Sequence, residues 1–242
     1  MIKFAYDAPA LIVGDSLVLA DLHIGRESKI IQHGDELLSI TEYMVSEIER
    51  LKEEHKLKDI IILGDVKEDI TSIPLQVHDF FSRIRPMFRR IAVLKGNHDG
   101  GIEKISGINV LDQELVIGGV AMAHGHKLFS PETFSCDYLL TAHRHFYFPM
   151  KSAVGKIYNM KIYAVVPPNI SGIHKKYGNI EVKKGMKAVF VPSFNPLITG
   201  QNVLESIRER KRHFENKIFK LDRATIYTLK GECLGNLPKL RR

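Results

Sequence analysis

The sequence predicts an α/β fold, and three observations support this prediction. Apolar, β-branched runs alternate with amphipathic segments over residues 18–94, in the order strand, helix, strand, helix, strand. Such alternation implies parallel strands joined by right-handed crossovers. After residue 100, short apolar runs separated by glycine and polar turns replace this alternation and predict a meander of strands. Because 242 residues can bury a sizeable core, we expect one domain over residues 1–242.

The spacing of apolar residues predicts the elements of the first half. Residues 18–20 read as a buried strand, and residues 36–54 as a helix whose apolar side chains recur every three or four positions. Two further β-branched runs predict strands, and the segment between them has a helical pattern. These strands are residues 60–63 and 91–94, and the helix is residues 75–90. The meander strands are expected at residues 108–111, 114–117, 119–123 and 138–142.

The second half is predicted to contain more strands than helices. Pro167-Pro168 marks a turn or the edge of a sheet, since proline cannot donate a ladder hydrogen bond. A helix is expected over residues 203–211. The strands are expected at residues 161–166, 180–182, 187–191 and 225–229.

Charge is divided unequally between the two parts of the chain. Residues 1–150 carry 16 Lys and Arg against 22 Asp and Glu, whereas residues 151–242 carry 19 against 6, a formal charge of +13. Residues 151–187 contain eight lysines and a single acid, Glu181. A basic surface suits a polyanionic partner such as DNA or RNA. The alternative is a solvated basic face with no partner, which is the usual meaning of a charge run.

Composition also bears on the cellular setting. No apolar run reaches the roughly 18 residues that a membrane span needs. The first residues lack the basic and then apolar pattern of a secretory signal. The two cysteines, Cys136 and Cys233, are too few for a disulfide framework. We therefore expect a cytoplasmic protein with no membrane partner.

Five polar clusters follow apolar runs in the first 150 residues. They are Asp21-Leu-His23, Gly64-Asp65, Gly96-Asn97-His98-Asp99, His124-Gly-His126 and His143-Arg-His145. Asp, Asn and His ligate divalent metals, and strand ends that converge on one crevice bring such residues together. On a regular strand, Asp21 and His23 would point to one face, and so would His143 and His145. The clusters predict a metal-dependent phosphoesterase.

The chemistry of such a site assigns a role to several of these residues. Two cations about 3.5–4 Å apart can clamp a phosphoryl group and lower the pKa of a bound water, so that hydroxide forms near neutral pH. A bridging carboxylate is needed, and Asp65 is the candidate because it stands alone at the end of a strand. An imidazole, with an ordinary pKa of about 6.5, can protonate the leaving alkoxide. His98 is the candidate for this, with Asp99 orienting its ring.

Metal identity and substrate contacts are less constrained. The donors are oxygen and imidazole without thiolate, which disfavours a structural zinc site. Manganese is the expected ion, with iron, cobalt or zinc as alternatives. Arg26 and Lys67 lie near the clusters in sequence and are candidates for contacting substrate phosphate, although both would also suit a solvent-facing position.

The five clusters resemble the pattern D-x-H, G-D, G-N-H-D/E, H and G-H-x-H of the calcineurin-like metallophosphoesterase superfamily. The resemblance implies a four-layer αββα sandwich of two mixed β-sheets flanked by helices, with the metals at its upper edge. Residues 1–150 would carry the metal motifs, and the basic residues 151–242 would complete the second sheet. The first ion would be held by Asp21, His23, Asp65 and His145. The second would be held by Asp65, Asn97, His124 and His143.

A second resemblance is less specific, and there are two departures from the family pattern. The segment Val191-Pro-Ser-Phe-Asn-Pro-Leu-Ile-Thr-Gly200 is similar to an archaeal branch related to the SbcD-type repair nucleases. Ala142 stands where the family usually has glycine, which demands an ordinary φ there. Residues 64–69 offer no clear additional ligand. His126 is expected to be a supporting or structural residue, because His124 fits the ligand position.

Three functions remain open on the sequence. The first is a phosphodiesterase or nuclease acting on nucleic acid or nucleotides through a hydroxide activated by two metals. The second is a phosphomonoesterase that uses the same metals, and the third is a non-catalytic scaffold of the same fold. Phe146, Tyr147 and Phe148 would either stack a base or pack in the core.

Overall fold

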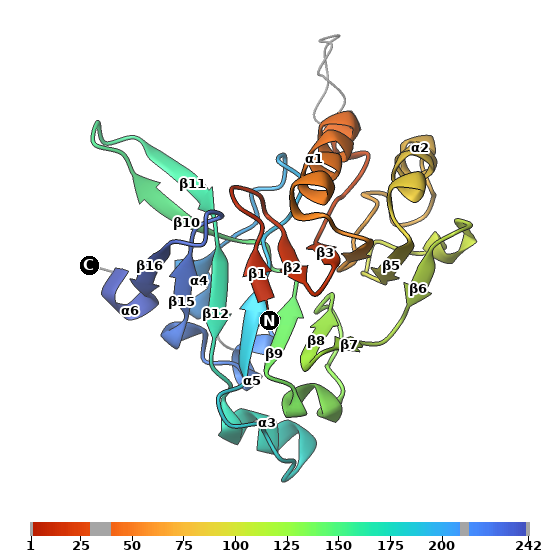
Figure 1. Ribbon diagram of the computed structural model, residues 1–242. Helices are drawn as coiled ribbons and strands as arrows, with labels where there is room; N and C mark the ends of the chain where they lie inside the picture. Colours follow the sequence, from red (N-terminus) through yellow and green to blue (C-terminus); the bar gives the residue numbers. More distant parts are fainter. Residues whose placement is uncertain (1, 30–39, 209–212, 241–242) are drawn as a thin grey trace.

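The computed structural model describes residues 2–29, 40–208 and 213–240 (Figure 1). Its first sheet has six strands in sequence order, antiparallel from β1 to β3 and parallel from β3 to β6. The strands are β1 (Ile2–Phe4), β2 (Leu11–Val13), β3 (Ser16–Leu19), β4 (Asp59–Ile62), β5 (Arg90–Leu94) and β6 (Asn109–Leu111).

The second sheet has seven strands, of which three neighbours, the fourth to the sixth in spatial order, run parallel. In spatial order they are β16 (Cys233–Asn236), β15 (Thr225–Tyr227), β12 (Tyr163–Val166), β13 (Lys187–Phe190), β9 (Tyr138–Thr141), β8 (Val120–Ala123) and β7 (Leu115–Ile117). A third, small sheet has the order β11 (Ile157–Lys161), β10 (Phe146–Lys151) and β14 (Gln201–Asn202). Strands β10 and β11 form a hairpin that projects from the body of the molecule (Figure 1).

Each large sheet is apolar on both faces, because alternate residues of a strand point to opposite sides. In β4, Ile60 and Ile62 contact the helical layer, whereas Ile61 packs into a core that is shared with the second sheet. The shared core also takes Met122 from β8 and Val189 from β13. The two sheets therefore lie face to face with a core between them.

Helices cover the two outer faces (Figure 1). On the first sheet lie α1 (Ile40–His55) and α2 (Leu75–Ile84), whose buried faces contribute to one core. On the second sheet lie α3 (Ile170–Tyr177), α4 (Val203–Arg208), α5 (Glu215–Ile218) and α6 (Leu237–Leu240). Short 3-10 helices span Arg26–Lys29, Arg85–Met87, Ile102–Lys104, Pro131–Ser135 and Leu221–Arg223. The expected four-layer αββα sandwich is thus confirmed, with the small third sheet as an addition.

Several predicted elements need correction. The meander after residue 100 is wrong in part, because β6 pairs parallel with β5 in the first sheet while β7 lies in the second. Residues 180–182 form no strand, and residues 85–90 leave the predicted helix. Lys161 ends β11 instead of starting β12.

Other elements are only partly tested or are new. Residues 36–39 and 209–211 of two predicted helices lie outside the described residues, while the remainder forms α1 and α4. The elements that were not predicted are the strands β1, β2, β10, β11, β14 and β16 and the helices α3, α5 and α6. Within residues 2–29, 40–208 and 213–240, no helix combines the length and apolar character needed to cross a bilayer.

Candidate metal centre

The first two polar clusters form loops that extend the ladder between β3 and β4. The Asp21 amide donates to the Gly64 carbonyl at 3.1 Å, and the His23 amide donates to the Asp65 carbonyl at 2.9 Å. Regular pairing ends before these residues, and the chain turns through left-handed backbone at Asp21 (φ 53°), His23 (φ 42°) and Asp65 (φ 49°). The predicted placement of Asp21 and His23 on one face of a regular strand is therefore wrong.

The last cluster has the same local geometry. His143 and His145 have φ angles of 66° and 34°, so these two residues also lie outside a regular strand. The His143 amide donates to Asp21 Oδ2 at 3.2 Å, which joins the loop after β9 to the loop after β3. Asp and His are among the residues that tolerate the left-handed region best, so the residue types suit both the backbone and the chemistry. Ala142 keeps an ordinary φ, as expected.

Glycine at position 96 allows the closest approach in the site. A Cβ atom there would lie 2.2 Å from Asp65 Oδ1 and 2.3 Å from the Asp65 amide nitrogen. The same aspartate oxygen accepts a hydrogen bond of 2.8 Å from the His98 amide. The third loop therefore presses against Asp65 and fixes the direction of its carboxylate.

The predicted ligands gather into one cluster. Its buried members are Asp21, His23, Asp65 and His124, whereas His143 and His145 are half-buried and Asn97 is exposed. His145 Nε2 lies 3.4 Å from Asp21 Oδ1, and His124 Nε2 lies 3.3 Å from Asp65 Oδ2. His23 Nε2 is 3.7 Å from the same oxygen of Asp65. Possible donor atoms fall into three groups, each within 4.8 Å of one another: Asp21, His23 and His145; His23, Asp65 and His98; and Asp65, His124 and His143. Asn97 joins them through its Oδ1, 3.2 Å from His124 Nε2.

Two of these atoms suit a cation. Asp21 Oδ1 and His23 Nε2 are buried and have no hydrogen-bond partner among the described residues. A buried polar atom without a partner is costly, so such atoms in a native fold call for an explanation. Two carboxylates, an amide oxygen and several imidazoles form a donor set that divalent metals accept. The residues therefore fit metal ions.

Contacts on the far side of two rings direct their other nitrogen into the cluster. His124 Nδ1 lies 2.7 Å from the Leu63 carbonyl, which only accepts, so Nδ1 keeps a proton and Nε2 is the atom that can ligate once it has given up its own. His23 Nδ1 lies 2.9 Å from Glu68 Oε2, and Glu68 is buried. A carboxylate behind a histidine ligand fixes the ring and strengthens it as a donor. Sequence reasoning missed Glu68, although an acid three residues after Asp65 was visible.

His98 and Asp99 have different partners from those expected. The His98 ring faces the cluster and is held by Nδ1, which lies 2.9 Å from the Glu68 carbonyl. Asp99 is fully buried and accepts from the Val66 amide at 2.9 Å and the Gly96 amide at 2.8 Å. Asp99 therefore holds the second and third loops together and does not orient the His98 ring, which corrects that prediction.

The two candidate phosphate contacts differ in their surroundings. Arg26 is partly exposed and donates from Nη1 to Glu68 Oε1 at 2.8 Å. Its guanidinium therefore contacts the carboxylate that also contacts His23. Lys67 is fully buried, and its ammonium donates to the Asp69 carbonyl and, at 3.0 Å, to the Ile70 carbonyl. This geometry contradicts the predicted phosphate contact of Lys67, because its charge is turned into the protein.

Burial and paired charge set the protonation of the cluster. Burial alone would raise the pKa of Asp65, but the adjacent His124 outweighs it and holds that pKa well below its usual range. For His124, burial is outweighed by Asp65 and Asp21, which raise its pKa to about 9. Burial lowers the pKa of His23, and burial together with His124 lowers that of His143 to about 4. Both of these rings are therefore neutral near pH 7, as a metal ligand must be.

The segment over residues 191–200 holds the backbone of the loop after β3 through hydrogen bonds. Ser193 Oγ donates to the Asp21 carbonyl at 2.7 Å, and Asn195 Nδ2 donates to the Leu22 carbonyl at 2.7 Å. Lys161 Nζ in turn donates to the carbonyls of Ser193 at 2.8 Å and Asn195 at 2.5 Å. These polar residues hold the backbone of the loop that bears two ligands, and sequence reasoning gave none of them this role.

A buried arginine holds the last loop. Arg144, between two ligand histidines, is fully buried and donates from Nε to Gln201 Oε1 at 2.8 Å. Its guanidinium lies 5.2 Å from the centroid of the Phe146 ring, and Nη1 lies 3.7 Å from Glu215 Oε2. The loop is thereby tied to β14 and α5. Phe146 and Phe148 are both buried, so these two rings pack in the core and do not stack a base.

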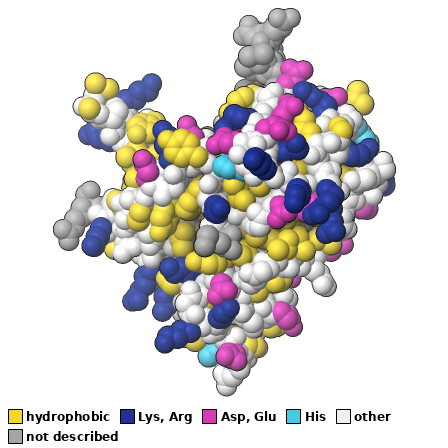
Figure 2. All heavy atoms as spheres, in the orientation of Figure 1, with side chains coloured by type: hydrophobic (Ala, Val, Ile, Leu, Met, Phe, Trp, Pro, Cys, Tyr) yellow, Lys and Arg dark blue, Asp and Glu magenta, His cyan; other side chains and the backbone are white. Residues whose placement is uncertain are grey.

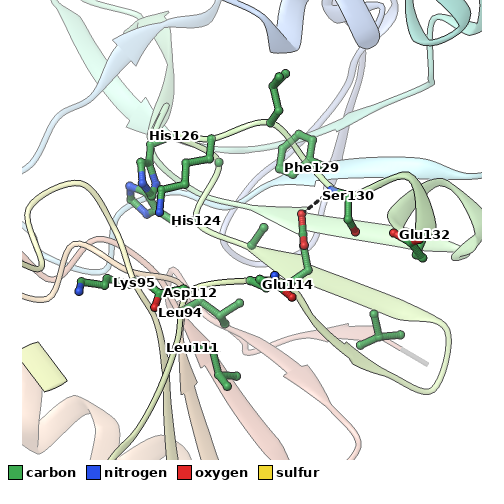
Figure 3. Close-up of a pocket in the computed structure, with 16 residues that line it drawn as sticks. Leu94, Lys95, Leu111, Asp112, Glu114, His124, His126, Phe129, Ser130 and Glu132 are labelled. Carbon is green, nitrogen blue, oxygen red and sulfur yellow. Dashed lines mark hydrogen bonds between the residues drawn. The ribbon is translucent and has the colours of Figure 1, made fainter. Parts of the chain in front are cut away.

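A cavity of about 690 Å³ adjoins the cluster on the side of β6, β7 and β8. Figure 3 shows His124 and His126 at one end of it and Phe129, Ser130 and Glu132 on the far wall. The His126 ring centroid lies 5.2 Å from that of His124, and burial lowers the pKa of His126 to about 4. Three acids line this cavity: Asp112, Glu114 and Glu132.

A family match and one solved structure agree with this fold. The model of one protein family, described as calcineurin-like phosphoesterase, matches residues 16–225. The crystal structure of nuclease MPE from Pseudomonas putida is similar at 18% identity, with a TM-score of 0.57 over 92% of this chain and 89% of that one. Yfce, a phosphoesterase from E. coli, is 15% identical with a TM-score of 0.36 over 57% of this chain and 74% of that one. None of the curated proteins matches the chain. The narrower likeness to SbcD-type nucleases stays a prediction.

Proposed function

Because this chain belongs to the calcineurin-like phosphoesterase family, we propose that it hydrolyses phosphodiester bonds and that nucleic acid is its substrate class. The observation that carries the proposal is the convergence of side chains from five loops on one cluster, in which two buried polar atoms make no hydrogen bond. Packing alone does not explain two carboxylates and several imidazoles at this depth, since buried ionisable groups are costly unless paired or ligating.

Two divalent cations, which we propose to be manganese, are the cofactor. Asp21, His23, Asp65 and His145 would hold the first, and Asp65, Asn97, His124 and His143 would hold the second. When bound, such ions lower the pKa of a water nucleophile and neutralise charge on the phosphoryl oxygens. Glu68 and the Leu63 carbonyl act behind this set by keeping the Nε2 atoms of His23 and His124 directed inward.

His98 is the proposed proton donor to the leaving group. Its Nδ1 is held by the Glu68 carbonyl, which can only accept, so Nδ1 keeps its proton. Nε2 is then the atom through which the ring can give up a proton to an alkoxide. General acid catalysis of this kind contributes about 10²–10⁴-fold to a rate.

Two observations support nucleic acid over a small phosphate ester. Residues 151–242 carry a formal charge of +13, which favours a substrate with many phosphates. Nuclease MPE, which shares the fold over most of both chains, is by its name a nuclease. The first is a property of this chain, and the second is a property of the similar protein.

A parallel activity panel tests the proposal. We expect manganese-dependent hydrolysis of bis-p-nitrophenyl phosphate and of DNA or RNA, and little turnover of p-nitrophenyl phosphate. His98→Gln should lower kcat by about 10²–10⁴-fold while manganese still binds. His78→Gln, on the exposed face of α2, is the matched control and should behave as wild type. A preference for the monoester would indicate a phosphatase, and a manganese-loaded protein without turnover on any ester would indicate a scaffold.

A further inference from the structure

Both strands of the β10–β11 hairpin join the body of the molecule next to the candidate metal centre. Strand β10 begins at Phe146, directly after the ligand His145, and β11 ends at Lys161, whose ammonium contacts the carbonyls of Ser193 and Asn195 under the first loop. The turn that connects the two strands projects away from the body of the molecule (Figure 2). The five residue pairs of the hairpin extend about 16 Å at roughly 3.3 Å per residue.

The chemistry of the hairpin is basic and apolar. Residues 146–161 contain three lysines and no acid. Val154, Ile157 and Tyr158 are 90%, 67% and 48% exposed. Large apolar side chains that are exposed as a group usually mark a binding surface. Lys151 and Lys156 are exposed beside them.

The strand register places these groups relative to the metal centre. Tyr147 pairs with Lys161, and Lys151 pairs with Ile157, so all four lie on one face of the hairpin. At its root this face meets the support of the first loop through Lys161. On the opposite face, Phe148 is buried in the core under the second sheet. One face therefore runs outward from the metal centre.

The other flank of the metal centre is unsuitable for a polyanion. The cavity beside His124 is lined by Asp112, Glu114 and Glu132 against the lysines Lys95 and Lys127. Its acids would repel a run of phosphates, whereas the hairpin offers cations alone. Figure 1 shows β10–β11 and the β6–β7 region on opposite sides of the molecule.

We propose that the β10–β11 hairpin is a binding arm for the part of a polynucleotide that flanks the scissile phosphate. This rests on the proposed function, whose substrate it specifies as a chain and not a mononucleotide. Lys151 and Lys156 contact backbone phosphates, and Ile157 contacts bases or sugars. At about 3.4 Å per nucleotide step, an arm of about 16 Å covers about five steps.

The test compares charge reversal on the arm with the same change elsewhere. The arm variant is Lys151→Glu/Lys156→Glu, and the control is Lys175→Glu/Lys176→Glu on the exposed face of α3, at the far end of the molecule in Figure 1. Binding of a labelled 12-nucleotide DNA to the full chain is measured by fluorescence anisotropy in EDTA at several salt concentrations. Rates with manganese are measured on bis-p-nitrophenyl phosphate and on the oligonucleotide.

We expect the arm variant to bind the oligonucleotide at least tenfold more weakly, and its salt slope to be smaller by about 1.4, as expected for two lost single-strand contacts. Its rate on bis-p-nitrophenyl phosphate should equal that of wild type. The α3 control should bind within twofold of wild type.

Other outcomes separate this inference from the proposed function. Unchanged binding by the arm variant, or equal losses in the arm and α3 variants, would overturn the arm. Sedimentation that shows a wild-type dimer broken by the arm variant, with unchanged oligonucleotide binding, would assign the open edge of β11 to a second copy and also overturn it. Arm-dependent binding without hydrolysis of any diester would uphold the arm and reject the proposed function.

Discussion

Replacing Glu68 by glutamine removes one negative charge from behind the His23 ring and preserves the shape of the side chain. In the structure, Glu68 Oε2 lies 2.9 Å from His23 Nδ1, and Oε1 accepts a hydrogen bond of 2.8 Å from Arg26. A neutral amide can still contact the ring, but it no longer strengthens Nε2 as a donor. We therefore expect the first ion to bind more weakly, with little change in the fold.

The size of the effect follows from the position of Glu68. Carboxylates that support a histidine ligand contribute about 10–100-fold to metal affinity, which corresponds to about 1.4–2.7 kcal/mol. Because Glu68 is only 6% exposed, solvent screens this contact little, and we expect the upper half of the range. Glu68→Ala should lose more, since Arg26 then also lacks this partner.

Isothermal titration with manganese measures the effect, and chemical denaturation monitors the fold. Glu103→Gln, at an exposed surface pair with Lys95, is the matched control and should leave metal affinity unchanged. Arg26→Gln separates two roles of the arginine: a weaker metal affinity indicates support through Glu68, whereas a raised KM at constant metal affinity indicates contact with substrate phosphate. A metal affinity of Glu68→Gln equal to that of wild type would refute the reasoning.

Three further changes test the site at other points. Gly96→Ala should lower kcat about 10²-fold, because its Cβ would lie 2.2 Å from Asp65 Oδ1 and the loop must move by roughly 1 Å. Arg144→Met should lower the free energy of unfolding by about 3–5 kcal/mol, since the buried Glu215 then loses the Arg144 guanidinium and must either bear an uncompensated charge or take up a proton, and Glu215→Leu in the same chain should restore most of the loss. The apparent manganese affinity should rise about tenfold per pH unit between pH 6 and 8, because the His124 ring, with its pKa of about 9, must lose a proton when it ligates.

Each of these has a measurement and a contrary result. Steady-state rates on bis-p-nitrophenyl phosphate test Gly96→Ala, and a rate within threefold of wild type would contradict the close approach. Urea denaturation tests Arg144→Met. If Arg144→Met/Glu215→Leu were as unstable as Arg144→Met alone, the buried Glu215 carboxyl would not be the cause of the lost stability. Titration in buffers of different ionisation enthalpy counts the protons released, and no release at pH 7 would contradict a protonated His124.

Much of the fold could be predicted because its buried strands are continuous apolar runs in the sequence. The runs at residues 60–63 and 91–94 are apolar at every position, and strands of this kind lie between two cores. The hairpin was missed because Tyr147, Lys151 and Tyr158 do not fit an alternating pattern of apolar and polar residues. One face of the hairpin meets solvent, and the other face meets the core only where the hairpin joins the body of the molecule. The membership of β6 in the first sheet depends on pairing across the chain, which spacing does not encode.

The clustering of the candidate ligands could be predicted from the sequence, whereas the residues that support them could not. Asp21 and His145 belong to short motifs with recognisable residue types, whereas Glu68 and Asn195 act through contacts that arise only after folding. Lys67 was misjudged for the same reason, because nothing in the sequence shows that its ammonium turns inward to backbone carbonyls. Sequence therefore indicates the chemistry of a loop, and tertiary contacts decide how the loop is held.

The left-handed backbone at five ligand positions narrows what evolution or engineering can place there. Asp21, His23, Asp65, His143 and His145 all have φ between 34° and 66°, a region where a β-branched side chain is an outlier. Alanine exchange at these sites therefore mixes two effects, the loss of a donor atom and a conformational cost of about 1 kcal/mol or more. Asparagine keeps the turn and removes the charge, so it is the cleaner probe, and a chain that abandoned catalysis would drift towards asparagine or glycine before valine.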